Sequence, residues 1–116
     1  MQKTITPSIC KPKKNEDGTE TAAAYAGQVV MKMPTYDERM AIYEDSGVED
    51  SANLKSLRLV RLLAKKLPDY LVSVDIKRLE DGYEFKDWAS LQYDSDMGSV
   101  ISDCCLALIG KIKAGN

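Results

Sequence analysis

The cysteines are the residues of this chain that could do the most reactive chemistry. There are three of them, with Cys104 and Cys105 adjacent and Cys10 far away near the N-terminus. A catalytic thiol needs an exposed, electropositive setting and a base. The chain has no histidine, so the commonest base and the commonest transition-metal ligand are both missing. Because the adjacent pair falls in an apolar helical pattern, we expect buried, reduced thiols in an intracellular protein.

Carboxylates are the next candidates, because a converging pair can catalyse hydrolysis and a cluster can hold a metal ion. Nearly all of the acids fall at predicted helix starts, turns or polar faces, where they cap or are solvated. Asp94 and Asp96 resemble a fragment of a calcium loop, but the glycine and distal glutamate of that loop do not follow in register. The glycines are isolated, so no phosphate-binding loop is expected. We therefore predict no catalytic residues, no metal and no cofactor.

The composition predicts one small domain. The chain has 116 residues, of which 44% are hydrophobic, and this is enough for a core without metal or disulfide crosslinks. Its formal net charge of −2 gives no large attraction to nucleic acid or to anionic membranes. No apolar run approaches the roughly 20 residues of a membrane span, and there is no apolar signal core. We expect a soluble cytoplasmic protein without a membrane contact.

The N-terminal quarter is predicted to be an arm. Residues 1–27 are expected to lie outside a single domain at 28–116 and to be partly flexible. A short edge strand is possible at residues 3–9, and the polar residues 11–21 read as an exposed loop.

A strand and a helix follow the arm. Residues 28–33 alternate like a strand, which Pro34 ends. Thr35 and Glu38 match a capping box for a helix from Tyr36 to about Asp45. Tyr36, Met40 and Tyr43 would share one face of this helix.

A second helix is predicted at residues 52–67, with Ser51 as its N-cap. One apolar stripe on it consists of Leu57, Val60, Ala64 and Leu67, and three further leucines (Leu59, Leu62 and Leu63) widen that stripe. So broad an arc predicts contacts on more than one side. The polar face is basic, with Lys55, Arg58, Arg61, Lys65 and Lys66.

The clearest β signal lies after this helix. Val72, Val74 and Ile76 alternate with polar residues, and Asp81-Gly82 then predicts a hairpin turn leading to a return strand at residues 83–86. A connector at residues 87–94 is expected to form a helical turn capped by Asp87, with aromatic side chains that pin the hairpin to the last helix.

The last helix is the most regular feature of the sequence. Its inward seam follows helical spacing without a break and consists of Met97, Val100, Ile101, Cys104, Cys105, Leu108, Ile109 and Ile112. Ser95 or Asp96 is the expected N-cap, and Gly115 is the expected end. The whole pattern predicts an α+β fold, with a small antiparallel sheet or hairpin packed against about three helices and a long C-terminal helix.

Three segments in this order resemble the small tail assembly chaperones of long-tailed bacteriophages. They are the leucine-rich helix at 54–67, the hairpin that begins Val72-Ser73-Val74-Asp75-Ile76, and the connector Trp88-Ala89-Ser90-Leu91-Gln92-Tyr93-Asp94 before a terminal helix. Pro34-Thr35-Tyr36-Asp37-Glu38-Arg39 is similar to the start of these proteins. The resemblance covers residues 28–116.

The resemblance implies a role without catalysis. Such proteins bind the long helical tape measure protein, keep it soluble and help to recruit tail tube protein, in the cytoplasm of the host cell. The partners implied are the tape measure protein and, in addition, the tail tube protein, and the chain could also form a homo-oligomer. A partner-binding surface is expected on the first and second helices, from Met40, Tyr43, Leu59, Leu62, Leu63, Arg58 and Arg61.

The sequence is compatible with two other functions. A small regulatory protein could bind nucleic acid through the basic face of the helix at residues 52–67. This face lacks interleaved aromatic residues for base stacking, so solvation explains it better. An enzyme is the third and weakest alternative.

Overall fold

The computed structural model describes residues 1–46 and 57–109, and the side chains of residues 1–45 and 59–109. In chain order the elements are β1 (Gln2–Ile5), the 3-10 helix η1 (Ser8–Cys10), β2 (Lys13–Lys14), β3 (Glu20–Thr21), β4 (Tyr25–Lys32), α1 (Tyr36–Ser46), α2 (Leu57–Lys66), the 3-10 helix η2 (Leu67–Asp69), β5 (Leu71–Arg78), β6 (Glu84–Phe85), α3 (Trp88–Tyr93), the 3-10 helix η3 (Ser95–Met97) and α4 (Gly98–Leu108). None of the helices in the described ranges has the length and apolar character needed to cross a membrane.

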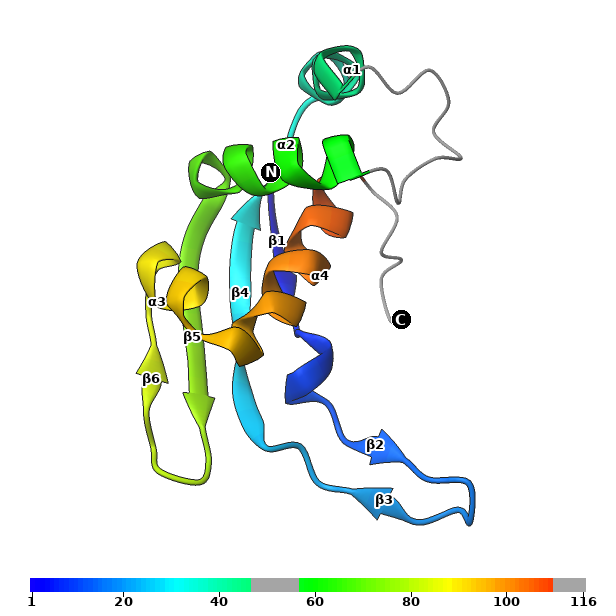
Figure 1. The fold of residues 1–116 in the computed structure, drawn as a ribbon, viewed down its shortest axis with the longest axis vertical. Helices are drawn as coiled ribbons and strands as arrows, with labels where there is room; N and C mark the ends of the chain where they lie inside the picture. Colours follow the sequence, from blue (N-terminus) through cyan, green and yellow to red (C-terminus); the bar gives the residue numbers. More distant parts are fainter. Residues whose placement is uncertain (47–56, 110–116) are drawn as a thin grey trace.

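The centre of the fold is a four-stranded antiparallel sheet with the order β1-β4-β5-β6. Helices α3 and α4 lie over one face of this sheet, α2 runs across one end of it, and α1 lies beyond α2 (Figure 1). The architecture is α+β, as the sequence pattern predicted.

The strands bury alternate side chains on the face that the helices cover. Val29 and Met31 of β4 and Ile76 of β5 are inaccessible to solvent, whereas Gln28 and Asp75 on the opposite face are exposed. This alternation follows from the two-residue period of a strand. The buried cluster includes Ile5, Val29, Met31, Leu59, Leu63, Leu67, Val74, Ile76, Phe85, Leu91, Met97, Val100, Cys104 and Leu108.

The sheet begins earlier in the chain than the predicted domain boundary at residue 28. Strand β1 pairs with β4 over Gln2↔Lys32 to Ile5↔Val29, and β4 itself begins at Tyr25. Ile5 and Tyr25 are buried, and this explains why both ends of the expected 1–27 arm join the domain. The part that stands apart from the body is the β2–β3 hairpin.

Helix α1 begins with the predicted capping box. Thr35 N–H donates to Glu38 Oε1 at 3.1 Å, and Glu38 N–H donates to Thr35 Oγ1 at 3.2 Å. The buried residue is Ile42, with Met40 and Tyr43 half-buried, whereas Tyr36 is 70% exposed. Tyr36 therefore does not belong to the inner face.

The inward face of α2 is also rotated from the predicted stripe. Leu59, Leu63 and Leu67 are buried, whereas Val60 is 39% exposed. Residues four apart lie above one another on a helix, so these leucines form the line that contacts the core. The predicted start of this helix, with Ser51 as its cap, lies outside the described residues.

The predicted β-hairpin is present as β5 and β6. Gly82 adopts φ 74°, and Arg78 N–H donates to the Tyr83 carbonyl at 2.8 Å across the turn. A register shift between Val30 and Met31 makes Val72 an extra residue, because Ser73 pairs with Val30 and Leu71 with Met31. Val72 is consequently exposed, although simple alternation placed it in the core.

The connector and the last helix form as predicted, with different details. Asp87 caps α3 by accepting from Ser90 N–H at 2.8 Å, and Leu91 is buried. Tyr93 is 89% exposed, so it does not fix the hairpin to the last helix. Asp94, which was not among the expected caps, accepts from Asp96 N–H at 2.8 Å and starts η3 before α4. The expected helix end, with Ile112 and Gly115, lies outside the described residues.

Candidate protein-binding surface

The adjacent cysteines belong to the core. Cys104 and Cys105 on α4 are 0% and 3% exposed. Burial raises the pKa of Cys104 to about 12 and that of Cys105 to about 11, so both thiols stay protonated at neutral pH. Cys10 on η1 is partly buried, and burial together with the negative charge of Asp103 raises its pKa as well. The described part of the predicted seam, residues 97–109, thus faces inward, and its thiols are held in their unreactive form.

The acids that resembled a calcium loop have structural partners. Asp94 Oδ2 accepts from Arg78 Nη2 at 2.8 Å, and Asp96 Oδ2 accepts from the Tyr25 hydroxyl at 2.8 Å. Asp81 Oδ2 is a second carboxylate on Arg78, at 3.1 Å from Nη1. Within the described ranges, no group of three or more His, Cys, Asp or Glu side chains is placed to hold a metal ion.

Arg78 is the centre of this polar network. Its guanidinium lies over the rings of Tyr83 and Phe85, at 5.7 and 5.4 Å from the ring centroids. Hydrogen bonds to Tyr25 and Asp81 raise the pKa of Arg78, so its charge is permanent. Because aromatic faces and carboxylates surround the guanidinium, the network holds the hairpin against η3.

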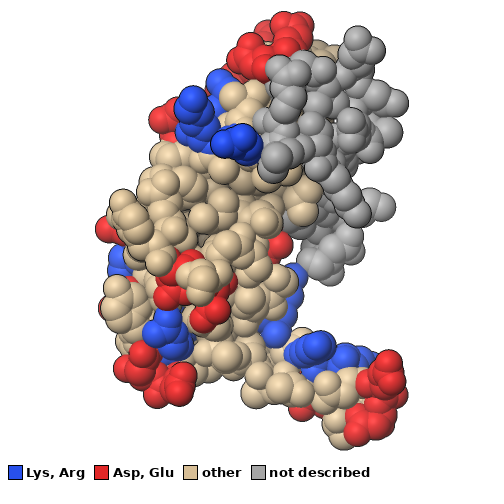
Figure 2. All heavy atoms as spheres, viewed as in Figure 1, with Lys and Arg blue, Asp and Glu red and all other residues tan. Residues whose placement is uncertain are grey.

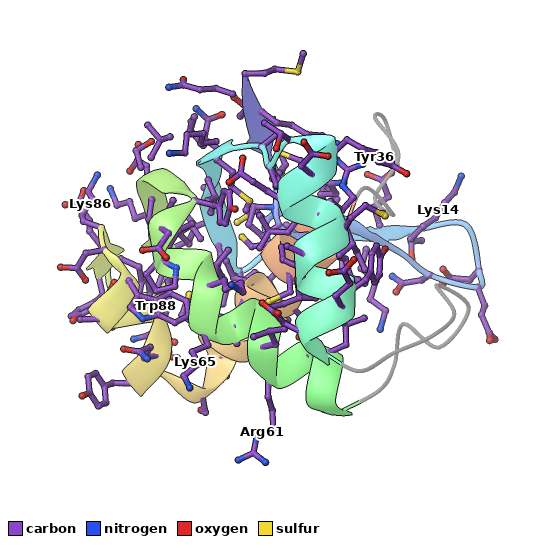
Figure 3. All side chains as sticks on the ribbon, turned by 90° about the horizontal axis from the view of Figure 1, so that it is seen from above. Lys14, Tyr36, Arg61, Lys65, Lys86 and Trp88 are labelled. Carbon is purple, nitrogen blue, oxygen red and sulfur yellow. The ribbon has the colours of Figure 1, made fainter. Side chains whose placement is uncertain are left out.

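A hollow of about 650 Å³ opens between α2 and α3. We call it the α2–α3 hollow, and its lining residues are Asp45, Arg61, Leu62, Ala64, Lys65, Trp88 and Gln92. Leu62, Ala64 and Trp88 are the half-buried apolar part of this lining, which we call the floor, and the exposed side chains of Arg61, Lys65 and Gln92 are its rim. In the view from above, Lys65 lies next to Trp88 and Arg61 extends outward from α2 (Figure 3).

The rim of this hollow is positively charged. Neither Arg61 nor Lys65 has an ion-pair partner among the described residues. The acid at the rim, Asp45, lies 3.9 Å from Lys66, and both side chains are exposed, so this contact is weak. The rim therefore offers two cationic side chains to a ligand with negative charges.

The seven residues expected to bind a partner lie at different depths. Leu62 and Arg61 line the α2–α3 hollow. Leu59 and Leu63 are buried in the core and do not line the hollow, and Met40 and Tyr43 are half-buried on α1. The side chain of Arg58 lies outside the described residues.

Sequence reasoning missed the α3 side of the hollow. Trp88 and Gln92 come from a segment whose aromatic side chains were expected to pin the hairpin to the last helix, not to line a surface hollow. Their spacing of four residues on a short helix, with an aromatic residue among polar neighbours, was the available signal. The sequence pattern placed Lys65 on the polar face of α2 and Ala64 in its apolar stripe, so it did not indicate that both line one hollow.

Comparisons of the chain with known protein families, with curated proteins and with solved structures give no match. The surface must therefore be interpreted from its own geometry and charge.

Proposed function

We propose that this chain is a non-catalytic assembly factor that binds a helical segment of another protein in the α2–α3 hollow. The observation that carries this proposal is the combination of an apolar floor, made by Leu62, Ala64 and Trp88, with the cationic rim of Arg61 and Lys65. An aromatic and aliphatic floor binds apolar anchors, and arginine and tryptophan are enriched where binding energy concentrates.

The partner that fits is an amphipathic helix with acidic residues beside its apolar stripe. Such a helix places apolar side chains on one face at spacings of three and four residues, and a groove between two helices accepts that face. Its carboxylates would pair with Arg61 and Lys65 at the rim. Rim pairs increase the association rate and orient the ligand more than they add affinity.

The phage tail tape measure protein is our proposed partner. This protein is long and helical, and the resemblance of residues 28–116 to tail assembly chaperones implies such a client, with tail tube protein as a further partner. The role would be to keep the client soluble in the host cytoplasm before the tube forms around it.

Co-expression with a tape measure protein tests this function. The wild-type chain should keep the client in the soluble fraction. Arg61→Glu combined with Lys65→Glu should reduce the soluble client at least fivefold, because two rim attractions become repulsions. The matched control is Lys13→Glu with Lys14→Glu, which reverses two exposed lysines on the distant β2–β3 hairpin and should leave the soluble client unchanged. An equally insoluble client with and without the wild-type chain would refute the proposal.

Nucleic-acid binding is the second candidate, because Arg61 and Lys65 are exposed on one helix. It predicts that the chain retards duplex or single-stranded nucleic acid at low salt, and that the same rim variant abolishes the retardation. If retardation is absent at low salt, this candidate is eliminated.

A further inference from the structure

The β2–β3 hairpin projects from the body of the molecule, at the end opposite to α1 and α2 (Figures 1 and 2). Of the predicted arm at residues 1–27, only residues 11–22 project in this way, and we now call these residues the arm. Every residue of the arm is exposed except Asn15, which is half-buried, so the arm contributes nothing to the core. An ordered hairpin with no apolar contacts needs another reason for its conformation.

The arm is ordered by its own polar groups. Asn15 Nδ2 donates to Thr19 Oγ1 at 3.1 Å and to Thr21 Oγ1 at 3.0 Å. Asp17 Oδ1 accepts from the Thr19 hydroxyl at 2.6 Å, and Gly18 adopts φ 89° at the turn. At the root of the arm, Ser8 N–H donates to Asp103 Oδ2 at 2.9 Å, which fixes η1 to α4. The arm therefore presents its side chains in a defined direction.

The charges of the arm are segregated along its length. Strand β2 consists of two lysines, Lys13 and Lys14, whereas Glu16 and Asp17 follow at the tip. Glu20 lies opposite Lys14 in the hairpin, so Lys13, whose cross-strand neighbour is Thr21, is the less neutralised of the two lysines.

A second hollow, of about 500 Å³, lies between the root of the arm and the β5–β6 turn. We call it the end hollow, and its lining includes Ile9, Ala24, Arg78, Leu79, Glu80 and Asp96. Leu79 is 55% exposed, which makes it an apolar side chain without a cover within the described part of the chain.

The end hollow is acidic. Glu80 and Asp96 line it, and the Arg78 charge beside them is paired with Asp81 and Asp94. Lys77 is the other cation near the turn, since its Cε lies 3.7 Å from the position of a Cβ on Gly82. The lining thus has two carboxylates, Glu80 and Asp96, and one guanidinium that Asp81 and Asp94 already pair, so the end hollow attracts positive charge.

We propose that two copies of this chain associate through this end, with the lysine strand of each arm on the end hollow of the other. The lysines and the carboxylates belong to the same end of one molecule, so a two-fold axis brings each set onto its complement and closes the assembly at two. Leu79 and Ala24 of the two copies supply apolar contact, which is needed because exposed ion pairs alone are weak. This association leaves the α2–α3 hollow open for its client and does not depend on the function proposed above.

Light scattering after gel filtration, over a range of concentrations, tests the association. The wild-type chain should show the mass of two copies at high concentration and should dissociate more readily as salt rises. Two variants should each raise the dissociation constant of the dimer at least tenfold. One is Lys13→Glu with Lys14→Glu, and the other is Glu80→Lys. Both variants should fold, because Lys13, Lys14 and Glu80 are exposed, and circular dichroism would verify this.

Mixing the two variants gives the decisive result. The glutamate arm of one variant faces the lysine of the other, so an equimolar mixture should dimerise more tightly than either variant does alone. Arg61→Glu with Lys65→Glu at the opposite end should dimerise like the wild type. A wild-type chain that stays monomeric at every concentration would overturn the proposal. So would variants that dimerise as tightly as the wild type, a mixture that dimerises no more tightly than either variant alone, or loss of the dimer in the control at the opposite end.

Discussion

At the residue scale, the side chains with reactive potential are used for structure. The adjacent thiols were predictable as core residues because they fall on an unbroken helical seam, and both are buried. The hydrogen bonds between polar side chains of distant segments could not be predicted in this way. Tyr25 and Asp96 are 71 positions apart, and only the folded chain brings them into a hydrogen bond. Helical spacing is visible in a sequence, whereas a contact between distant segments is not.

The buried thiols predict a loss of stability in alkali. The pKa of Cys104 rises from 9.0 to about 12 and that of Cys105 from 9.0 to about 11, and the pKa of Tyr70 rises from 10.0 to about 12, with burial as the main cause. The unfolded chain ionises these groups at lower pH than the folded chain does. The stability they contribute is therefore complete below about pH 9 and falls as pH rises toward 11 to 12.

Urea unfolding at a series of pH values measures this loss. Cys104→Ala with Cys105→Ala should flatten the decline above pH 9 and leave the smaller part that belongs to Tyr70, Tyr25 and Cys10, whose pKa values are also raised. If the double variant and the wild type decline equally, thiol ionisation is not the cause.

Gly27 is a second residue-scale determinant of the fold. It adopts φ 139° as the third residue of β4, and a Cβ at this position would collide with the carbonyl oxygen of Asp75 on β5. We expect Gly27→Ala to lower the free energy of unfolding by more than about 3 kcal/mol, since it combines a strained backbone with a backbone clash.

Gly98→Ala is the matched control. Gly98 has φ −57° at the start of α4, and a Cβ there meets nothing within 4 Å. This change should be neutral or should stabilise by up to roughly 1 kcal/mol, because alanine favours a helix. Thermal unfolding of both variants distinguishes the two sites, and equal losses would show that the close approach of β4 and β5 is unimportant.

At the scale of the elements, local signals predicted where helices and strands form but not how each one faces. The capping box of α1, the Asp81-Gly82 turn and the Asp87 cap of α3 are all where the sequence indicated. The predicted face of α1 included Tyr36, which is exposed. The predicted stripe of α2 included Val60, which is 39% exposed, whereas the buried residues are Leu59, Leu63 and Leu67. Broad apolar arcs fit more than one rotation, and packing against the sheet chooses among them.

Helix α3 has one structural role that bears on the candidate surface, because it carries Trp88 and Gln92. It is a short helix, so its N-terminal cap matters: Asp87 and Ser90 bond to each other's backbone in a capping box. Asp87→Ala should lower the free energy of unfolding by about 1 kcal/mol and should weaken partner binding further through a less ordered Trp88.

Hydrogen exchange of the α3 amides measures that loosening locally. Faster exchange in α3 with unchanged exchange in β4 and β5 is the expected pattern. Exchange that is unchanged in α3 would indicate that the cap does not hold the helix.

At the scale of the whole molecule, two opposite ends carry different chemistry. One end has the apolar floor and cationic rim of the α2–α3 hollow, and the other has the lysine strand of the arm beside the acidic end hollow. The fold class could be predicted from element order. The two hollows could not, because each is lined by segments that are far apart in the sequence and meet only in the folded chain.

The emission of Trp88 tests the central claim most directly, because Trp88 is the only tryptophan of the chain and lies in the α2–α3 hollow. The titrant is an acidic, amphipathic helical segment of a tape measure protein that contains no tryptophan. We predict a saturable blue shift of the emission that Leu62→Glu abolishes and that Tyr93→Ala, an exposed change on the same helix, leaves intact. Binding detected by calorimetry without any change at Trp88, or no binding of the segment at all, would contradict the account.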